Sequence, residues 1–275
     1  MNIAPRQFVP RTGMICALFC AAATIALSGK CAVTNTPAEM ALKIQWVQRN
    51  LLGGSNSAPF SLNFNGQASS TSNLFSSWTR SSADTVLDSV RTRHTLLWTN
   101  SSNGLQVKCV AVEYLDFPVV EWTVYLTNGG PANTPIIQAI QGLDTTLSRL
   151  AGDPEFVLNG NQGDFMTADS YEPWQKILGP NSENDFGPAG SGKSTEGPTG
   201  WPYYDLQTPG GGMILAIGWP GNWGSSFTRD SATGLRIQAG QKLTHLYLKP
   251  GETIRTPLIT LMFWQGTDVV RAQNL

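Results

Sequence analysis

The chain has 275 residues, a formal net charge of −1 and 13% charged residues, about half of the share that is usual in globular proteins. Its Lys and Arg residues form no basic patch of the kind that nucleic acids require, so the composition excludes a nucleic-acid-binding protein. With 28 Gly and 17 Pro residues it favours sheets joined by turns over helices.

Residues 1–30 have the pattern of a signal peptide. Two Arg residues lie within positions 6–11, and an uncharged apolar run with small residues at its end follows over positions 14–27. The run is shorter than the roughly 20 residues that span a bilayer. We therefore expect a secreted or periplasmic protein. Cys31 would be the acylated residue of a lipoprotein, but Lys30 does not fit the small residue that such a site needs.

One helix is expected in the N-terminal segment 31–58, before the strands begin. Pro37 suits the first helical position, and Gly53-Gly54 ends the helical pattern at about residue 52. Apolar residues at helical spacing predict the face that packs on the core: Ala38, Ala41, Leu42, Val47 and Leu51.

From residue 59 the apolar residues recur with the period of a strand, and turns such as Asn65-Gly66 separate the segments. The predicted strands are 60–64, 96–100, 105–111, 119–126, 135–143, 213–219, 225–230, 235–239, 243–248 and 257–264. Short strands joined by short turns are typical of antiparallel sheets that pack face to face. The predicted fold is all-β, a large antiparallel β-sandwich over residues 59–264.

Residues 159–200 are rich in Gly and Pro and predict a long irregular excursion, which in a compact domain is usually functional. Within it, Gly187–Ser194 matches the phosphate-binding loop pattern. Such a loop requires a strand before it and a helix after it, so that backbone N–H groups converge on the phosphates. The flanking residues predict neither element, and we expect no nucleotide.

The cysteines and histidines predict no redox or metal chemistry. Cys16 and Cys20 would leave with the signal, and Cys109 lies in an alternating strand as a buried free thiol, so there is no disulfide framework. His94 and His245 lie in strand patterns without metal-ligand spacing. We expect structural roles for both histidines, at half-exposed strand positions, and no metal and no cofactor.

A glycosidase needs two carboxylates on either side of one bond. The sequence offers Glu113, Asp116, Glu121, Asp144, Asp164, Asp169 and Glu172, but their spacing defines no such pair. For Glu113 and Glu121 we expect solvent-facing strand positions or pairing with Arg. No catalytic residue is assigned.

Tryptophans in Gly- and Pro-rich turns are the best functional indication. Trp219 and Trp223 share one such turn, and Trp174 lies in another. A flat indole beside polar amides suits the apolar face of a sugar ring. Alternatively, these rings close the ends of the core or pack on a neighbouring domain. Trp98 and Trp122 lie within strands, and we expect both to be buried.

Four segments, in their order and spacing, carry a family resemblance: residues 104–122, 143–146, 210–219 and 249–258. They resemble the amino-terminal domain of bacterial alpha-galactosidases of glycoside hydrolase family 36. The resemblance covers about residues 59–275. It implies a β-supersandwich that a helix links to a (β/α)₈ barrel, with residues 265–275 as the start of that linker and Thr267 or Asp268 as its cap. The barrel of that family supplies an Asp nucleophile and an Asp acid/base, and this sequence contains no part that matches it.

The resemblance implies a non-catalytic domain that shapes or covers the sugar pocket of a barrel, with a galactoside or other carbohydrate and the barrel itself, in cis or in trans, as partners. The candidate residues that face the sugar or the barrel are Trp219, Trp223, Trp174, Asp144 and Asp164. Two alternatives stay open: a free-standing carbohydrate-binding or scaffold protein, and an enzyme that acts through its own carboxylates.

Overall fold

The computed structural model describes residues 33–54, 57–164, 166–190 and 193–275. The predicted signal peptide with Cys16 and Cys20, and the candidate acylation site Cys31, lie outside these residues. No helix of the described part has the length and apolar character to cross a membrane.

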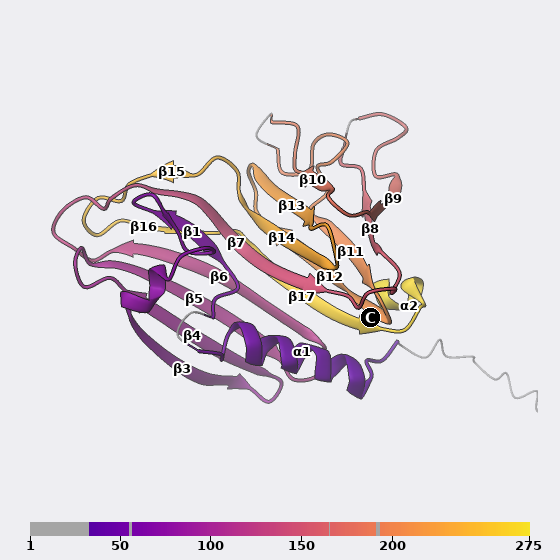
Figure 1. Ribbon diagram of the computed structural model, residues 1–275, viewed down its shortest axis with the longest axis horizontal. Helices are drawn as coiled ribbons and strands as arrows, with labels where there is room; N and C mark the ends of the chain where they lie inside the picture. Colours follow the sequence, from indigo (N-terminus) through magenta and orange to yellow (C-terminus); the bar gives the residue numbers. More distant parts are fainter. Residues whose placement is uncertain (1–32, 55–56, 165, 191–192) are drawn as a thin grey trace, which may run out of the picture. The chain divides into compact units, whose positions relative to one another are not determined.

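Within the described residues the strands form two antiparallel sheets, which confirms the predicted all-β sandwich (Figure 1). The smaller sheet has the strand order β10-β13-β14-β7-β1-β2, with β15 paired to β7. Its strands are β1 (Ser61–Phe64), β2 (Gln67–Ala68), β7 (Ile137–Ser148), β10 (Glu183–Phe186), β13 (Trp223–Arg229), β14 (Gly234–Gln241) and β15 (His245–Leu246).

The larger sheet has the order β3-β4-β5-β6-β17-β12-β11-β8-β9, with β16 paired to β6. Its strands are β3 (Thr79–Asp88), β4 (Arg91–Thr99), β5 (Leu105–Tyr114), β6 (Val119–Asn128), β8 (Phe156–Asn161), β9 (Pro173–Leu178), β11 (Tyr203–Thr208), β12 (Gly211–Gly218), β16 (Thr253–Arg255) and β17 (Leu258–Gln265). A 3₁₀ turn, Leu74–Ser77, precedes β3.

The core lies between the sheets and follows the predicted alternation. Trp98 and Trp122 are fully buried as expected, and the indole Nε1 of Trp122 donates to the carbonyl of Gly142 in β7 at 2.7 Å. Cys109 is a buried free thiol, also as expected, and burial raises its pKa. Apolar side chains from both sheets therefore form one core.

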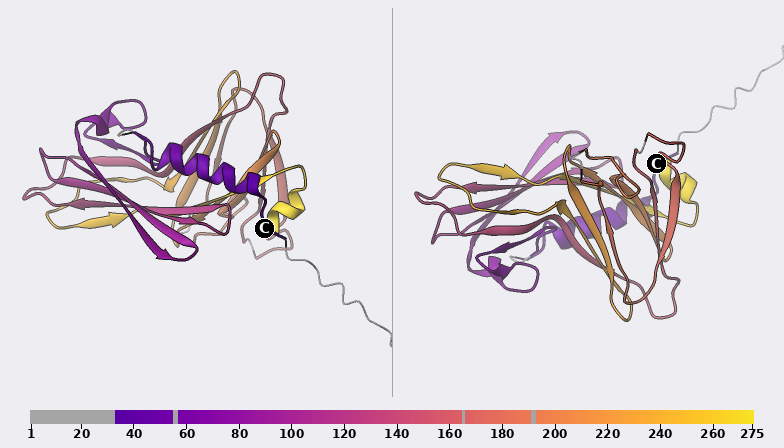
Figure 2. Two further views of the ribbon diagram at one scale, coloured as in Figure 1. Left: turned by 90° about the horizontal axis from the view of Figure 1, so that it is seen from below. Right: turned by 90° about the horizontal axis from the view of Figure 1, so that it is seen from above.

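Helix α1 (Pro37–Asn50) begins where the sequence predicts, with Pro37 in the first turn and a capping box between Thr36 and Glu39. It packs on β17 and β6, and in the view from below it lies in front of the strands (Figure 2). Trp46 stacks on Trp122, with ring centroids 5.0 Å apart. The helix thus covers a part of the larger sheet.

The predicted packing face of α1 was wrong in its first half. Val47 and Leu51 are buried as predicted, but Ala38, Ala41 and Leu42 are exposed. Glu39 and Lys43 are buried in their place. The reason is electrostatic pairing, because Lys43 meets Glu113 of β5 and Glu39 meets Arg271. Although burial opposes it, hydrogen bonds from Arg271 lower the pKa of Glu39 to about 2.

The predicted irregular excursion at 159–200 was also wrong in part. Strand β8 extends to Asn161, and β9 and β10 lie within the segment. The ring of Trp174 in β9 lies against Gly160 of β8. A side chain at position 160 would clash with it, because a Cβ there would lie 2.4 Å from the Trp174 ring. The prediction also missed β3 and β11, and the expected strand at 243–248 is only β15.

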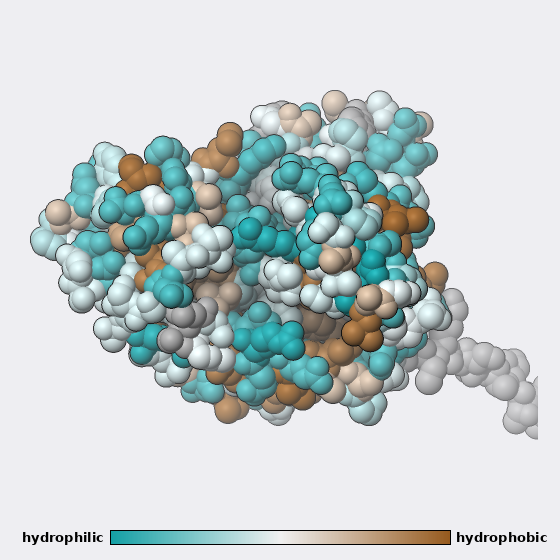
Figure 3. Space-filling model, in the orientation of Figure 1, coloured by the Kyte–Doolittle hydropathy of each residue, from teal (hydrophilic) through white to brown (hydrophobic). Residues whose placement is uncertain are grey.

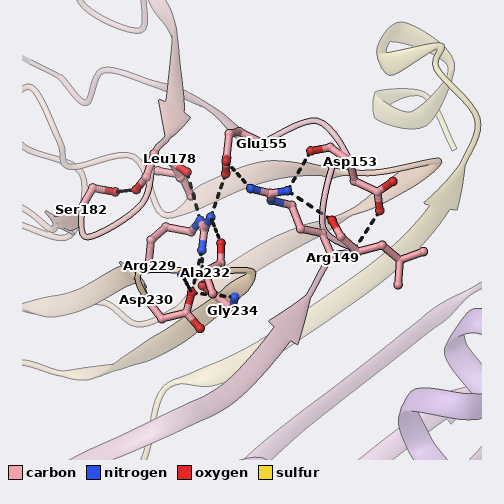
Figure 4. A network of polar contacts seen from close by, with 11 residues as sticks. Arg149, Asp153, Glu155, Leu178, Ser182, Arg229, Asp230, Ala232 and Gly234 are labelled. Atoms are coloured by element: carbon pink, nitrogen blue, oxygen red, sulfur yellow. Dashed lines mark hydrogen bonds and ion pairs between the residues drawn. The ribbon is translucent and has the colours of Figure 1, made fainter.

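A buried arginine connects the sheets at the end of the sandwich (Figure 4). Arg229 of β13 donates to the carbonyl of Leu178 in β9 at 3.1 Å, to Glu155 at 2.8 Å and to Ala232 at 3.2 Å. Glu155 also accepts from Arg149. Because a buried guanidinium must have its donors satisfied, this network fixes both sheets in one arrangement.

The C-terminal helix α2 (Val269–Gln273) is capped by Asp268, one of the two predicted caps, whose carboxylate accepts from the backbone N–H of Arg271 at 2.9 Å. Arg271 then pairs with Glu39 of α1. This pair holds α2 beside the first turn of α1.

Candidate functional site

A cleft of about 1030 Å³ opens along β10, β13, β14 and β7 of the smaller sheet. Its floor includes a row in register across three strands, in which Asp185 pairs with Ser226 and Ser226 with Gln238. Segments of the chain at 187–190 and 198–199 line one part of it, and residues 242–245 line another. The cleft therefore lies between a Gly-rich loop and the chain that follows β14.

A β-bulge shapes the cleft floor. The pairing of β14 with β7 shifts between Ala239 and Gly240, and Ala139 next to the bulge has a φ of 49°. A Cβ at Gly240 would lie 2.5 Å from the carbonyl oxygen of Ile140. Only glycine therefore fits this position, and the bulge brings Gln141 opposite it.

The lining of the cleft is nearly uncharged and combines apolar surface with primary amides. Its ionisable side chains are Asp185, Lys242 and His245. Four of its residues are glutamines from β7 and β14: Gln138, Gln141, Gln238 and Gln241. Each primary amide offers two donors and an acceptor, so the cleft suits a neutral ligand with many hydroxyl groups.

Asp144 lies next to the cleft and orients one of its amides. Its carboxylate accepts two hydrogen bonds from Arg236, at 2.8 and 2.7 Å, and one from the Nε2 of Gln238 at 3.2 Å. This bidentate pair occupies the carboxylate. Asp144 therefore positions Gln238 and is not itself a free acid in the cleft.

Asp164 and Trp223 hold the loop that lines the cleft. The backbone N–H of Asp164 donates to the carbonyl of Thr195 at 2.7 Å, and its carboxylate accepts from the N–H of Met166 at 2.8 Å. Trp223 is fully buried and its Nε1 donates to the carbonyl of Ser194 at 2.7 Å. Because its ring is in the core, Trp223 offers no face to a sugar.

Trp174, in β9, and Trp219, between β12 and β13, are half-buried. Trp174 stacks on Phe186, with centroids 5.0 Å apart and planes within 5°. Trp219 packs on the core and carries the guanidinium of Arg255 over its ring at 5.1 Å. None of the five candidate residues is among the residues that line the cleft.

The phosphate-loop pattern at Gly187–Ser194 requires a correction. A strand does form before it, because β10 ends at Phe186, and the sequence prediction missed that strand. The described residues after it, 193–202, form no helix. The helix N-terminus that would bind a phosphate is therefore missing from this part of the chain.

His94 is buried between two carboxylates and is not at a half-exposed position. Its Nδ1 lies 2.8 Å from Asp84 and its Nε2 lies 3.1 Å from Glu113. The hydrogen bond to Glu113, followed by that to Asp84, raises the pKa of His94. The hydrogen bond from His94, followed by that from Lys43, lowers the pKa of Glu113.

Glu113 is therefore paired with Lys and His and not with Arg, contrary to expectation. Glu121 accepts from the hydroxyl of Tyr114 at 3.2 Å. Asp116, Asp169 and Glu172 are exposed. Among the described residues, no group of three His, Cys, Asp or Glu side chains could hold a metal.

Exposed apolar side chains gather away from the cleft, on a surface that we call the apolar edge: Leu42, Ile44, Val86, Leu87, Leu115 and Phe117. Its elements lie together, because Lys43 of α1 donates to the carbonyl of Tyr114 at 2.6 Å and the N–H of Leu115 donates to Val90 at 2.7 Å. Brown side chains follow the lower border of Figure 3, over α1 and the end of β3.

The cleft residues were missed because nothing in their sequence pattern marks them. Gln138 and Gln141 lie on either side of a bulge, which breaks the alternation of β7. Gln238 alternates normally and would be read as a solvent-facing residue. A clustering of Gln in neighbouring strands is visible only once their order in the sheet is known.

The fold is that of a large two-sheet β-sandwich with a cleft over its smaller sheet, and comparison with solved structures identifies that fold. No protein-family model and no curated sequence matches the chain. The fold is similar to that of the GH36 alpha-galactosidase AgaA from Geobacillus stearothermophilus, with a TM-score of 0.55 and 13% identity. That match covers 76% of this chain and 30% of the enzyme.

Two further structures agree. The alpha-galactosidase from Lactobacillus brevis matches with a TM-score of 0.54 and 13% identity, over 76% of this chain and 29% of the enzyme. The galactosidase domain of the alpha-galactosidase-sucrose kinase AgaSK matches with a TM-score of 0.52 and 16% identity, over 75% and 30%. This chain spans less than a third of these enzymes, and the resemblance seen in the sequence is confirmed at the level of the fold.

Proposed function

We propose that the chain is a non-catalytic N-terminal domain of an alpha-galactosidase-like glycoside hydrolase, and that it shapes or covers the sugar pocket of a (β/α)₈ barrel. The observation that carries the proposal is the fold that this chain shares with about 30% of the alpha-galactosidase chains. The signal pattern in residues 1–30 supports export from the cell.

The cleft supports a carbohydrate as the ligand. Structures of AgaA variants include complexes with stachyose and raffinose. Galactosides of this kind are neutral and rich in hydroxyl groups, which matches the glutamine-lined floor that Asp144 helps to order through Gln238. We infer that the cleft contributes amides to galactoside recognition.

The distribution of carboxylates supports a non-catalytic role. A retaining glycosidase needs a nucleophile and an acid/base about 5–5.5 Å apart. Among the described residues that line the cleft, Asp185 is the sole carboxylate. One carboxylate serves as a hydrogen-bond acceptor for a sugar hydroxyl but does not complete the pair.

The apolar edge supports a protein partner. Side chains such as Phe117, 42% exposed, and Ile44, 47% exposed, cost free energy in water unless another surface covers them. The apolar edge includes residues of α1, and Lys43 of this helix contacts Tyr114. The first turn of α1 also contacts α2, through the pair of Glu39 and Arg271. A barrel that follows α2 would lie close to it, and we propose the edge as the barrel-facing surface.

Turnover of p-nitrophenyl α-D-galactopyranoside by the purified chain tests the proposal. We expect no release of nitrophenol, and release that disappears in Asp185→Asn would establish an enzyme instead. The reading frame after the codon for Leu275 separates the proposal from a free-standing carbohydrate-binding protein: alternating strand and helix segments support the domain, and a stop codon supports the free-standing protein.

A further inference from the structure

A second hollow, with a volume of about 470 Å³, lies over β8, β9, β11 and β12 of the larger sheet. Four residues in register across these strands line it: Ile214, Asp205, Asn159 and Gln175. Because the flanking residues Tyr204 and Leu206 are buried in the core, Asp205 and Tyr203 lie on the opposite face of β11, outside the sandwich.

Three aromatic rings follow one another at the border of this hollow. Trp201 contacts Tyr171 with centroids 5.3 Å apart and Tyr203 with centroids 5.8 Å apart. Tyr171 is 49% exposed and Tyr203 is 51% exposed. Rings that are this exposed and already packed against each other offer apolar area to a ligand at little cost in side-chain entropy.

The backbone around Tyr171 is held in an unfavourable conformation. Its φ is +67°, in the left-handed region that residues with a side chain rarely adopt. The amide of Asn161 donates to the carbonyl of Tyr171 at 2.9 Å, and Asn161 itself lines the hollow. Strain of this kind persists where the surroundings enforce it, often at a binding site.

The hydrogen-bonding groups in the hollow are ordered and nearly uncharged. Asn159 donates to the carbonyl of Asp205 at 3.1 Å and accepts from Gln175 at 2.9 Å. The indole of Trp264 donates to Oδ1 of Asp205 at 3.0 Å, whereas Gln273 reaches Oδ2 only at 3.4 Å. Asp205 is the one carboxyl group among the described residues of this lining, and burial raises its pKa. These described residues include no Lys or Arg, so an anionic ligand is disfavoured.

We propose that this surface is a carbohydrate-binding site, separate from the cleft, for a neutral polysaccharide. Tyr171, Trp201 and Tyr203 pack against pyranose rings, and Asn159 and Gln175 exchange hydrogen bonds with hydroxyl groups. The site goes beyond the proposed function, because it contains no cleft residue and requires no barrel. It would hold the protein on a polymer.

Native electrophoresis of the full chain in gels that contain galactomannan tests the proposal, with dextran gels for comparison. We expect galactomannan to retard the chain, and Tyr203→Ala and Trp201→Ala to weaken that retardation at least tenfold. Tyr247→Ala removes another exposed tyrosine, 48% exposed and outside the hollow, and should migrate like the parent. Because Trp201 is half-buried, Tyr203→Ala with an unchanged circular dichroism spectrum is the deciding variant.

Three results would overturn the proposal. The first is a chain that neither galactomannan nor dextran retards. The second is retardation that Gln238→Ala removes and Tyr203→Ala leaves, because the ligand would then lie in the cleft. The third is self-association in sedimentation that Tyr203→Ala abolishes without any polysaccharide binding, which would identify a second copy as the occupant. Failure of the cleft to bind galactosides would leave the expected retardation unchanged.

Discussion

The ammonium group of Lys43 in α1 lies 2.8 Å from the carboxylate of Glu113 in β5, and the Lys43 side chain is only 1% exposed. This buried pair joins the helix to the sheet, although the apolar pattern of the helix predicts that Lys43 faces solvent. Glu113 also accepts from His94, so the pair is part of a longer chain of charges.

Lys43→Ala should destabilise the protein by about 3 kcal/mol, because removal of one partner leaves a buried carboxylate without its counter-charge. Urea unfolding measures the change in the free energy of unfolding. Leu42→Ala, on the exposed side of the same helix, is the matched control and should cost less than about 1 kcal/mol. Equal effects of the two substitutions would contradict the burial of the pair.

Stability should depend on pH through His94. Its folded pKa is raised, so its contribution is complete below the unfolded value of about 6.5 and is lost as the pH rises through the folded pKa. The groups that face it are Asp84, Glu113 and, through Glu113, Lys43. The free energy of unfolding should therefore fall above about pH 6.5 in the parent relative to His94→Gln.

The same cluster predicts a loss on the acid side. The folded pKa of Glu113 is lowered, so its contribution is present above its unfolded value and is lost as the pH falls through the folded pKa. Urea titrations of the parent and His94→Gln at a series of pH values measure both limbs. A constant difference between the two proteins from about pH 3 to about pH 9 would rule out this cluster as the cause.

Arg229→Ala should destabilise the protein by about 3–5 kcal/mol, because it leaves Glu155 and several carbonyl groups without their buried donor (Figure 4). The control is Arg255→Ala. The guanidinium of Arg255 is exposed above Trp219, so its loss should lower the free energy of unfolding by about 1 kcal/mol or less. Thermal unfolding followed by calorimetry compares the two. Near-equal melting temperatures would show that the network does not connect the sheets.

Trp223→Ala should cost about 3–5 kcal/mol, like Trp122→Ala, since both indoles are fully buried. Trp219 is half-buried, so Trp219→Ala should cost clearly less. Acrylamide quenching of variants that retain a single tryptophan provides an independent reading. Trp223 should resist the quencher as Trp122 does, and strong quenching of Trp223 would place it at the surface after all.

The strands were predictable where one face is buried. In β5 and β6, apolar residues such as Val107 and Trp122 alternate with polar ones, because one side faces the core. Strand β3 was not predictable, since it is an edge strand whose residues from Ser81 to Leu87 are exposed on both faces. The face of α1 was mispredicted for a related reason, as distant partners neutralise Glu39 and Lys43.

The sequence predicted residues beside the cleft but none of the residues that line it. Trp223 and Asp164 were singled out by their place among glycines, and both hold the loop beside the cleft. The glutamines of the floor come from strands far apart in the sequence, and the order β14-β7 brings Gln238 and Gln141 into one surface. Sheet order of this kind depends on long-range pairing, which local patterns do not encode.

A titration of the full chain with raffinose, followed by NMR, tests galactoside recognition without turnover, because one set of spectra reports both binding and hydrolysis. We expect saturable shifts of the side-chain amides of Gln138, Gln141, Gln238 and Gln241, the loss of these shifts in Gln238→Ala, and raffinose that stays intact. Free galactose in the spectra, or amides that do not respond to raffinose at any concentration, would contradict a non-catalytic domain that recognises galactosides through this cleft.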